Sequence, residues 1–279
     1  MGKIDKIGRT ISSESYWRSR ASSYSGSLGN DYHRHRLEVI RALLPTELFS
    51  PGRRVFDFGC GDASLFPLFI ERGAEIQGAD LSTEMVALAR ERLRGSGLPA
   101  DLVRVGGVDS LTSLPEASLD GLLAFNTLAY FSDVDEEAFY EHASRIVKPG
   151  GFLVLTHSNE LFDMFSLNSY TVDFFSKHFV DHEGQRARLR TLLVHADAPE
   201  YGTSYNVREN PLTYRYKLAR YGFREVAQEF INRHVAPPGP VEKEEYPDTL
   251  NVDAEARWKL MFVCSTFGSR SVRADGKGS

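Results

Sequence analysis

The chain has 279 residues, of which 42% are hydrophobic and 25% are charged, and its formal net charge is −5. This composition excludes a wholly disordered chain and supplies enough apolar material for one large α/β domain. The excess of acidic residues gives no general attraction to nucleic acid or to an anionic membrane, so neither partner is expected.

The two ends of the chain are polar. Residues 1–15 and 273–279 contain few large apolar side chains and are predicted to be disordered tails. No apolar run has the length of a signal-peptide core or of a membrane span. The only cysteines, Cys60 and Cys264, do not suggest a disulfide framework. A cytoplasmic protein is therefore expected.

Helical and β-rich runs alternate along the first half of the chain. The helices are predicted at residues 31–44, 64–71, 82–93 and 136–147. The strands are predicted at residues 54–58, 74–79, 101–105, 119–125 and 152–156. Such alternation predicts a parallel sheet with crossover helices.

The last part of the chain predicts a further helix at residues 211–221 and two more strands, at 224–235 and 259–267. This pair would close the sheet as a hairpin. Before it, residues 158–209 form a connection of about fifty residues that is dense in aromatic, histidine and arginine side chains. We expect a helical cap there, over the edge where open α/β sheets bind ligands.

A glycine-rich loop, residues 59–62, follows the first strand. Its glycines permit a tight turn and let backbone N–H groups approach a ligand. A dinucleotide-binding loop would carry a third glycine where this chain has Ser64. The carboxylates of Asp57 and Asp62 flank the turn and suit a cationic ligand. Asp80, at the end of the second strand, can accept hydrogen bonds from both ribose hydroxyls.

These motifs together resemble the class I S-adenosylmethionine (SAM) dependent methyltransferases, whose motifs match residues 55–64, 76–82, 103–111, 119–133 and 145–155. The resemblance implies a doubly wound, mostly parallel, seven-stranded α/β sheet of Rossmann-like type, with the helical cap inserted after the fifth strand. It also implies SAM as cofactor and S-adenosylhomocysteine (SAH) as product. On this basis residues 16–157 are predicted to form the SAM-binding core with N-terminal lid helices, residues 158–209 the cap, and residues 210–272 the last helix and strands.

The resemblance also assigns cofactor contacts. The backbone of Gly59, Cys60 and Gly61 would face the methionine moiety of SAM, with Asp57 and Asp62 near its sulfonium and amino group. Further contacts are implied for Asp80 with the ribose, for Leu81, Gly107, Val108 and Asp109 with the adenine, for Phe125 and Asn126 with the methionine carboxylate side, and for Tyr24 as part of an aromatic lid.

Methyl transfer from a sulfonium is an in-line displacement, which alignment and exclusion of water can accelerate without an acid or a base. If the acceptor is a hydroxyl group, a base must remove its proton. His157, at the end of the fifth strand, is the first candidate, and His33 and Tyr130 are the others. The spacing of His178 and His182 is helical, but no third ligand accompanies them, so no metal site is predicted.

The sequence therefore predicts a methyltransferase that acts on an oxygen or nitrogen atom of a small molecule, such as a sugar, a nucleotide-linked sugar or a natural-product intermediate. The alternative is a non-catalytic SAM-binding regulatory or partner protein of the same fold, because a cofactor loop shows binding capacity and no more. An NAD-dependent oxidoreductase is disfavoured by Ser64 and the flanking acids. Association into a homodimer stays open.

Overall fold

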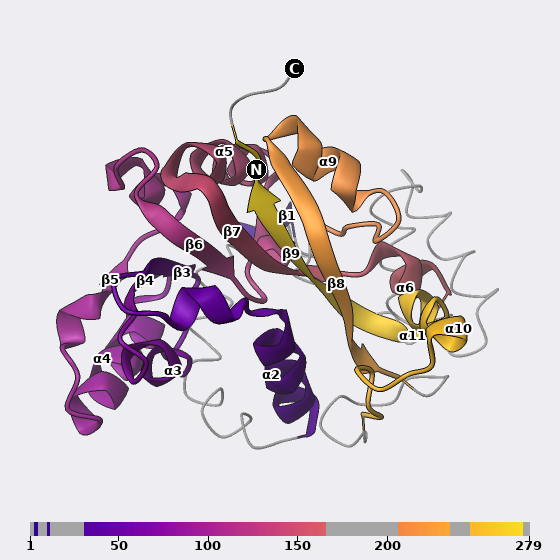
Figure 1. The fold of residues 1–279 in the computed structure, drawn as a ribbon, viewed down its shortest axis with the longest axis horizontal. Helices are drawn as coiled ribbons and strands as arrows, with labels where there is room; N and C mark the ends of the chain where they lie inside the picture. Colours follow the sequence, from indigo (N-terminus) through magenta and orange to yellow (C-terminus); the bar gives the residue numbers. More distant parts are fainter. Residues whose placement is uncertain (1–2, 5–9, 12–30, 166–205, 235–245, 276–279) are drawn as a thin grey trace.

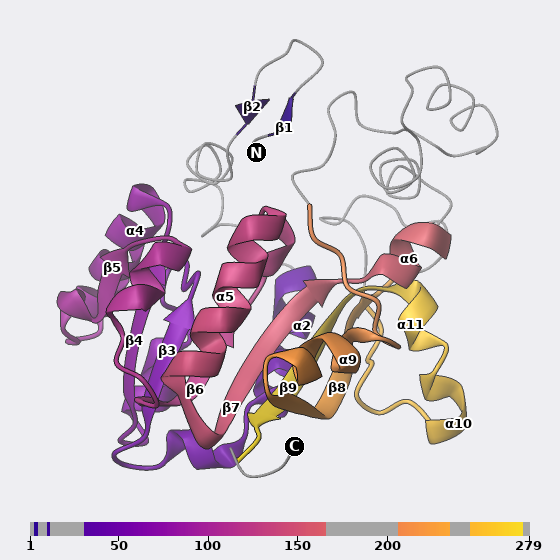
Figure 2. The same ribbon diagram turned by 90° about the horizontal axis from the view of Figure 1, so that it is seen from above.

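The computed structural model describes residues 3–4, 10–11, 31–165, 206–234 and 246–275. Most of them form a sheet covered by helices on both faces (Figures 1 and 2). Within the predicted N-terminal tail, β1 (Lys3–Ile4) and β2 (Thr10–Ile11) pair as short antiparallel strands, a regular structure that the composition does not indicate.

The main sheet has seven strands in the order β5-β4-β3-β6-β7-β9-β8. Their bounds are β3 (Arg54–Phe58), β4 (Glu75–Asp80), β5 (Val103–Val105), β6 (Leu119–Ala124), β7 (Val147–Ser158), β8 (Phe223–Arg233) and β9 (Cys264–Arg273). The first five are parallel to one another, and β9 is antiparallel to both of its neighbours. The predicted doubly wound, mostly parallel, seven-stranded sheet is confirmed.

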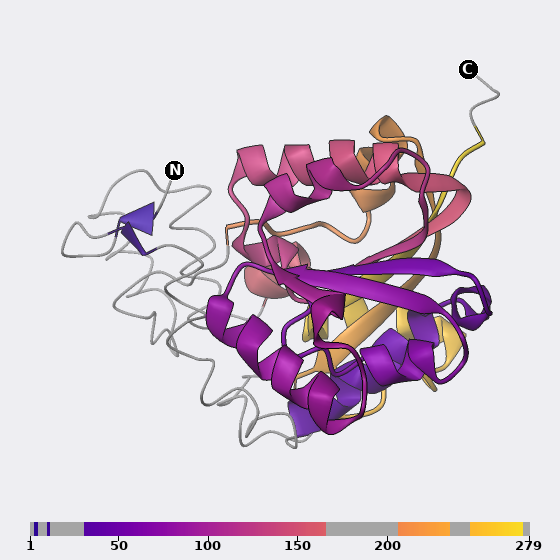
Figure 3. The same cartoon turned by 90° about the vertical axis from the view of Figure 1, so that its left-hand side faces the viewer.

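The helices lie in two layers, with the sheet between them (Figure 3). One layer contains α2 (Asp31–Leu43), α3 (Phe66–Ile70) and α4 (Thr83–Gly95), and the other contains α5 (Asp133–Ile146) and α9 (Tyr214–Arg220). Beyond the end of β7 lie the short helices α6 (Glu160–Phe165), α10 (Ala254–Arg257) and α11 (Leu260–Val263). Ser82 caps α4 as predicted, because its side chain accepts a hydrogen bond from the Met85 N–H at 3.2 Å.

The hydrophobic core has two parts, one on each face of the sheet. Side chains alternate along a strand, so Phe56 and Phe58 of β3 pack under α5 whereas Val55 packs with α2 and α3. Every residue of β6 is buried, as expected for the central strand of a sheet covered on both faces. The core therefore fixes the strand ends, and with them the loops that follow.

The last strand differs from its prediction. Residues 260–263 form α11, and β9 starts only at Cys264 and continues to Arg273, the first residue of the predicted C-terminal tail. An apolar run this short fits a helix or a strand equally well by periodicity, and burial of Leu260 in the core accompanies the helical form.

The carboxyl ends of β3 to β7 meet at one edge of the sheet, and β8 ends at the same edge because it is parallel to β7. Only residues 158–165 and 206–209 of the predicted cap are described, and the Glu209 N–H donates to the Ser158 carbonyl there at 2.9 Å. Across the described ranges of the chain, no helix is both long enough and apolar enough to cross a membrane. Cys60 and Cys264 are both free and buried, so the expectation of no disulfide is confirmed.

Candidate cofactor site

The glycine loop after β3 is held by its own backbone. Gly59 and Gly61 have φ values of +72° and +55°, which favour glycine. The N–H groups of Gly59 and Cys60 donate to the Ala79 carbonyl at 2.7 and 3.1 Å, and the Gly61 N–H donates to Asp80 Oδ2 at 2.9 Å. These N–H groups are therefore used inside the protein, which differs from the expectation that they meet a ligand. The loop has a fixed shape before any ligand binds.

Acidic side chains gather around this loop. Asp57, on β3, is 3% exposed, and burial together with the carboxylates of Asp80 and Asp62 raises its pKa to about 8. Burial also raises the pKa of Asp80, although the N–H groups of Ser82 and Gly61 oppose that shift. A cation bound beside Asp57 would stabilise its ionised carboxylate, which burial and the neighbouring acids disfavour. The loop therefore suits a positively charged ligand.

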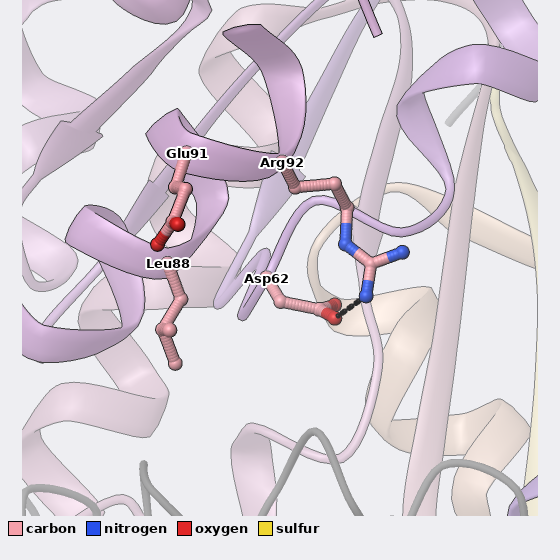
Figure 4. Close-up of a pocket in the computed structure, with 4 residues that line it drawn as sticks. All are labelled: Asp62, Leu88, Glu91 and Arg92. Carbon is pink, nitrogen blue, oxygen red and sulfur yellow. Dashed lines mark hydrogen bonds and ion pairs between the residues drawn. The ribbon is translucent and has the colours of Figure 1, made fainter. Parts of the chain in front are cut away.

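Asp62 has a different environment from the other two acids. Its Oδ2 atom pairs with Arg92 Nη2 of α4 at 2.6 Å, and its Oδ1 atom accepts from the Ser64 N–H at 3.3 Å. Figure 4 shows the Asp62 and Arg92 side chains pointing toward each other in a pocket that Leu88 and Glu91 also line. This geometry argues against the predicted contact between Asp62 and the amino group of SAM. Asp62 instead ties the loop to α4.

Asp80 lies at the carboxyl end of β4 with its carboxylate fixed in place. Its Oδ1 atom accepts from the Ser82 N–H at 2.9 Å and its Oδ2 atom accepts from the Gly61 N–H. Each carboxylate oxygen can accept a second hydrogen bond, so both remain able to receive a ribose hydroxyl. The two backbone bonds orient the group without occupying it completely.

An exposed apolar surface lies beside Asp80. Leu81 is 45% exposed and Val105, the register partner of Asp80 on β5, is 46% exposed. A Cβ atom added at Gly107 would lie 3.4 Å from Leu81 Cδ1, so the turn after β5 borders the same surface. Val108 and Asp109 follow in the 3₁₀ helix η3 (Val108–Ser113). The structure brings the predicted adenine contacts together and adds Val105, which lies within the matched motif of residues 103–111 but was not among the assigned contacts.

The predicted methionine-carboxylate contacts lie in the turn after β6. Asn126 has a φ of +56°, and its N–H donates to Thr156 Oγ1 of β7 at 2.7 Å. Phe125, just before it, is partly buried against the core. Since β3 and β6 are neighbours, this turn lies next to the glycine loop.

His157, the first candidate for the base, is enclosed in the core. It is 2% exposed, its Nε2 atom lies 3.1 Å from Ser269 Oγ, and its ring packs against Tyr214 and Phe267. Burial and the nearby Lys217 keep its pKa well below the usual value, so the imidazole is neutral. An imidazole enclosed in this way does not reach an acceptor bound above the sheet edge. The geometry therefore argues against His157 as the base.

The other candidates have different positions. Burial, and then the charge of Arg36, lower the pKa of His33 to about 4, and His33 Nδ1 lies 2.8 Å from the Arg36 guanidinium, from which it can only accept. Tyr130 is buried in the 3₁₀ helix η4 (Leu128–Tyr130), beside the segment of residues 206–207 that bonds to Ala129. Tyr24, His178 and His182 lie outside the described residues. Within the part of the chain that is described, no cluster of His, Cys, Asp or Glu side chains could hold a metal ion.

Sequence analysis missed a buried charged group between the two helices α5 and α9. Lys217 Nζ lies 2.5 Å from both Glu136 Oε1 and Glu209 Oε1. Burial raises the pKa of Glu209 to about 8 even though Lys217 opposes the shift. Glu136 lies 81 residues from Lys217 in the sequence, so no local pattern could have joined the three residues.

The strand order, the glycine loop after β3 and the acid at the end of β4 define the class I methyltransferase fold. Residues 56–155 match the family model of the methyltransferase domain. This part of the chain is a methyltransferase domain of the SAM-dependent class.

Comparison with curated proteins gives the same class. A ubiquinone biosynthesis O-methyltransferase of Paracidovorax citrulli (strain AAC00-1) is 31% identical over 124 residues, which are 44% of this chain and 50% of the relative. The chain thus spans about half the length of the curated relatives it matches.

Solved structures support the fold. A SAM dependent methyltransferase from Archaeoglobus fulgidus superposes with a TM-score of 0.54 at 18% identity, covering 89% of this chain and 99% of the other. Magnesium protoporphyrin IX methyltransferase from Synechocystis PCC 6803 with bound SAH gives a TM-score of 0.57 at 15% identity, and the match covers 94% of this chain and 98% of the other. At these identities the likeness concerns the fold alone.

Proposed function

We propose that the protein binds SAM and transfers its methyl group to an oxygen atom of a small molecule. The observation that carries this proposal is the order of chemical groups along the sheet edge. Carboxylates surround the fixed glycine loop, the oriented Asp80 follows, and the exposed Leu81 and Val105 lie beside it. SAM presents a cationic amino acid end, a ribose diol and a flat apolar base in the same order.

The chemistry that SAM supplies when bound is an electrophilic methyl group on a sulfonium. The residues of this chain bind and orient the cofactor. Asp57 and Asp80 favour its positive charge, and the two backbone bonds to Asp80 fix the carboxylate that would hold the ribose. Alignment of this kind can lower the barrier of a displacement reaction by several kcal/mol, roughly 7–11 in the best cases. The resemblance to ubiquinone biosynthesis O-methyltransferases supports oxygen as the acceptor atom.

Calorimetric titration with SAM and with SAH tests the binding step. We expect the wild type to bind both, and Asp80→Asn to bind each about 10- to 100-fold more weakly, because hydrogen bonds to a charged group are lost. Asp101→Asn removes the same charge from an exposed position and should leave both affinities unchanged. A wild type that binds neither compound, or an Asp80→Asn variant with full affinity, contradicts the proposal.

The transfer step needs a second assay. Transfer of labelled methyl from SAM is measured with separate panels of phenols, sugars and nucleotide-linked sugars, and the product is analysed for O- or N-methylation. We expect O-methylation within one panel. Binding of SAM without transfer to any panel would favour the non-catalytic SAM-binding alternative. Analytical ultracentrifugation of the same samples checks the homodimer prediction.

A further inference from the structure

The glycine loop is in contact with the turn after β6 through one side chain. A Cβ atom added at Gly59 would overlap Thr127 Oγ1 and would lie 2.7 Å from Thr127 Cγ2. The Thr127 side chain thus fills the place into which any other residue at position 59 would project. Gly59 is required there for this reason as well as for its positive φ.

The orientation of Thr127 is fixed by its own contacts. Its Oγ1 atom donates to the Phe125 carbonyl at 3.0 Å and lies 3.5 Å from the carbonyl of Phe58, the residue before Gly59. A β-branched side chain has few rotamers, so these contacts hold its methyl group in place as well. The preceding residue, Asn126, is bonded to Thr156 of β7. A continuous path of contacts therefore runs from β7 through the turn after β6 to the glycine loop.

Other contacts hold the far side of the loop. The N–H groups of Gly59 and Cys60 are bonded to Ala79 on β4, and Asp62 is paired with Arg92 on α4. Thr127 is the contact from the β6 side.

We propose that Thr127 is a positioning residue that fixes the glycine loop against the amino acid end of bound SAM. This inference rests on the proposed function. The adenine and ribose would be held by Leu81 and Asp80. Asp80 is oriented by the Ser82 N–H as well as by the Gly61 N–H of the loop, so a change at Thr127 should act more on the amino acid end of the cofactor than on the ribose. Displacements of about 1 Å at a reacting centre cost on the order of 100-fold in rate, so the contact also serves alignment of the methyl group.

The test compares two ligands that differ at that end. SAH carries the amino acid moiety, whereas 5′-methylthioadenosine keeps the adenine and ribose and lacks it. We expect Thr127→Ala to weaken SAH binding about tenfold while 5′-methylthioadenosine binding stays within about twofold. Thr127→Ser retains the hydroxyl nearest Gly59 and should restore most of the SAH affinity. Thr46→Ala, an exposed threonine at the opposite edge of the sheet, is the matched control.

The outcomes separate the two proposals. A wild type that binds neither ligand overturns the proposed function. A wild type that binds SAH, with Thr127→Ala unchanged for both ligands or weakened equally for both, overturns only the role of Thr127.

A second pair of variants tests the contact itself. Gly59→Ala should bind SAH poorly because its methyl group meets Thr127 and its φ is positive. Gly59→Ala combined with Thr127→Gly removes the clash but not the backbone strain, so the affinity loss of the double variant should be at least about fivefold smaller than the product of the two single losses. Thermal melts establish that each protein is folded. Additive losses in folded variants would contradict the contact.

Discussion

The two halves of the sheet bury ionisable side chains in different ways. In the cofactor half, strands β3 to β6, burial and then the carboxylates of Asp80 and Asp62 raise the pKa of Asp57. The far half consists of β7 to β9 with α6 and α9 (Figure 1). There, Lys217 of α9 lies between Glu209 and Glu136 of the neighbouring α5, and Asp163 pairs with Arg208. The charges of the far half are paired with opposite charges of the protein itself, and this pairing stabilises the fold. The acids around Asp57 have the same sign, so a ligand of positive charge would stabilise them.

The largest expected effect is a loss of stability, without a loss of ligand affinity, when the charged group of the far half is broken. Lys217→Met leaves the Glu136 and Glu209 carboxylates buried without their ammonium, and should lower the free energy of unfolding by about 3 kcal/mol. SAH affinity should stay within about twofold, because the side chains of this group bond to one another and not to the glycine loop. Urea unfolding at pH 9 measures the loss, which should shrink at pH 7 because Glu209, whose pKa is about 8, is then mostly protonated. Lys259→Met, at an exposed lysine, is the control. An equal loss of stability in this variant would show that the pairing of Lys217 with the two glutamates does not cause the effect.

The next effect belongs to the cofactor half and depends on pH. The pKa of Asp57 is raised from 3.8 to about 8, so between these values the folded protein binds a proton that the unfolded chain does not. Stability of the ligand-free wild type therefore falls as the pH rises from about 4 to about 8. Asp57→Asn removes the part of this dependence that Asp57 contributes and should be more stable at pH 8 by at least about 1 kcal/mol, or about 2–4 °C in Tm.

The same variant should bind SAH more weakly, because a negative charge beside the ligand's ammonium is lost. Thermal melts and titrations between pH 5 and pH 9 check both parts. Equal slopes of Tm against pH for wild type and Asp57→Asn would show that Asp57 does not cause the fall of stability with rising pH.

The smallest expected effect on methyl transfer concerns His157. His157→Leu loses the hydrogen bond to Ser269 and should cost about 1–2 kcal/mol of stability, since Ser269 keeps its bond to Tyr214. The pH dependence of methyl transfer, measured with an acceptor found in the panels, should be unchanged. If the variant lost a titration step between pH 6 and pH 8, His157 would be the base after all.

Much of the cofactor half followed from the sequence. The strand β3, the glycine loop and Asp80 are signalled by local patterns: alternating apolar residues, glycines at a turn and an acid at a strand end. Because parallel strands end at a common edge, these local signals are sufficient to bring the residues together in space.

The roles of several polar side chains depended on the tertiary structure. Asp62 was expected to face a ligand, but it pairs with Arg92, thirty residues further along the chain. His157 was expected at the open edge, but the long β9 strand and α9 enclose it. A strand-end position in the sequence does not tell which neighbours cover the side chain.

The sequence by itself determined the sheet, the cofactor loop and the acid at the end of β4, because each depends on residues close together in the chain. Only the tertiary structure decided which acid is buried beside other acids, as Asp57 is, and which is paired with an arginine, as Asp62 is. It also placed Thr127 against Gly59 and Lys217 between Glu136 and Glu209. Burial and pairing depend on residues far apart in the chain, and the folded core alone brings those residues into contact.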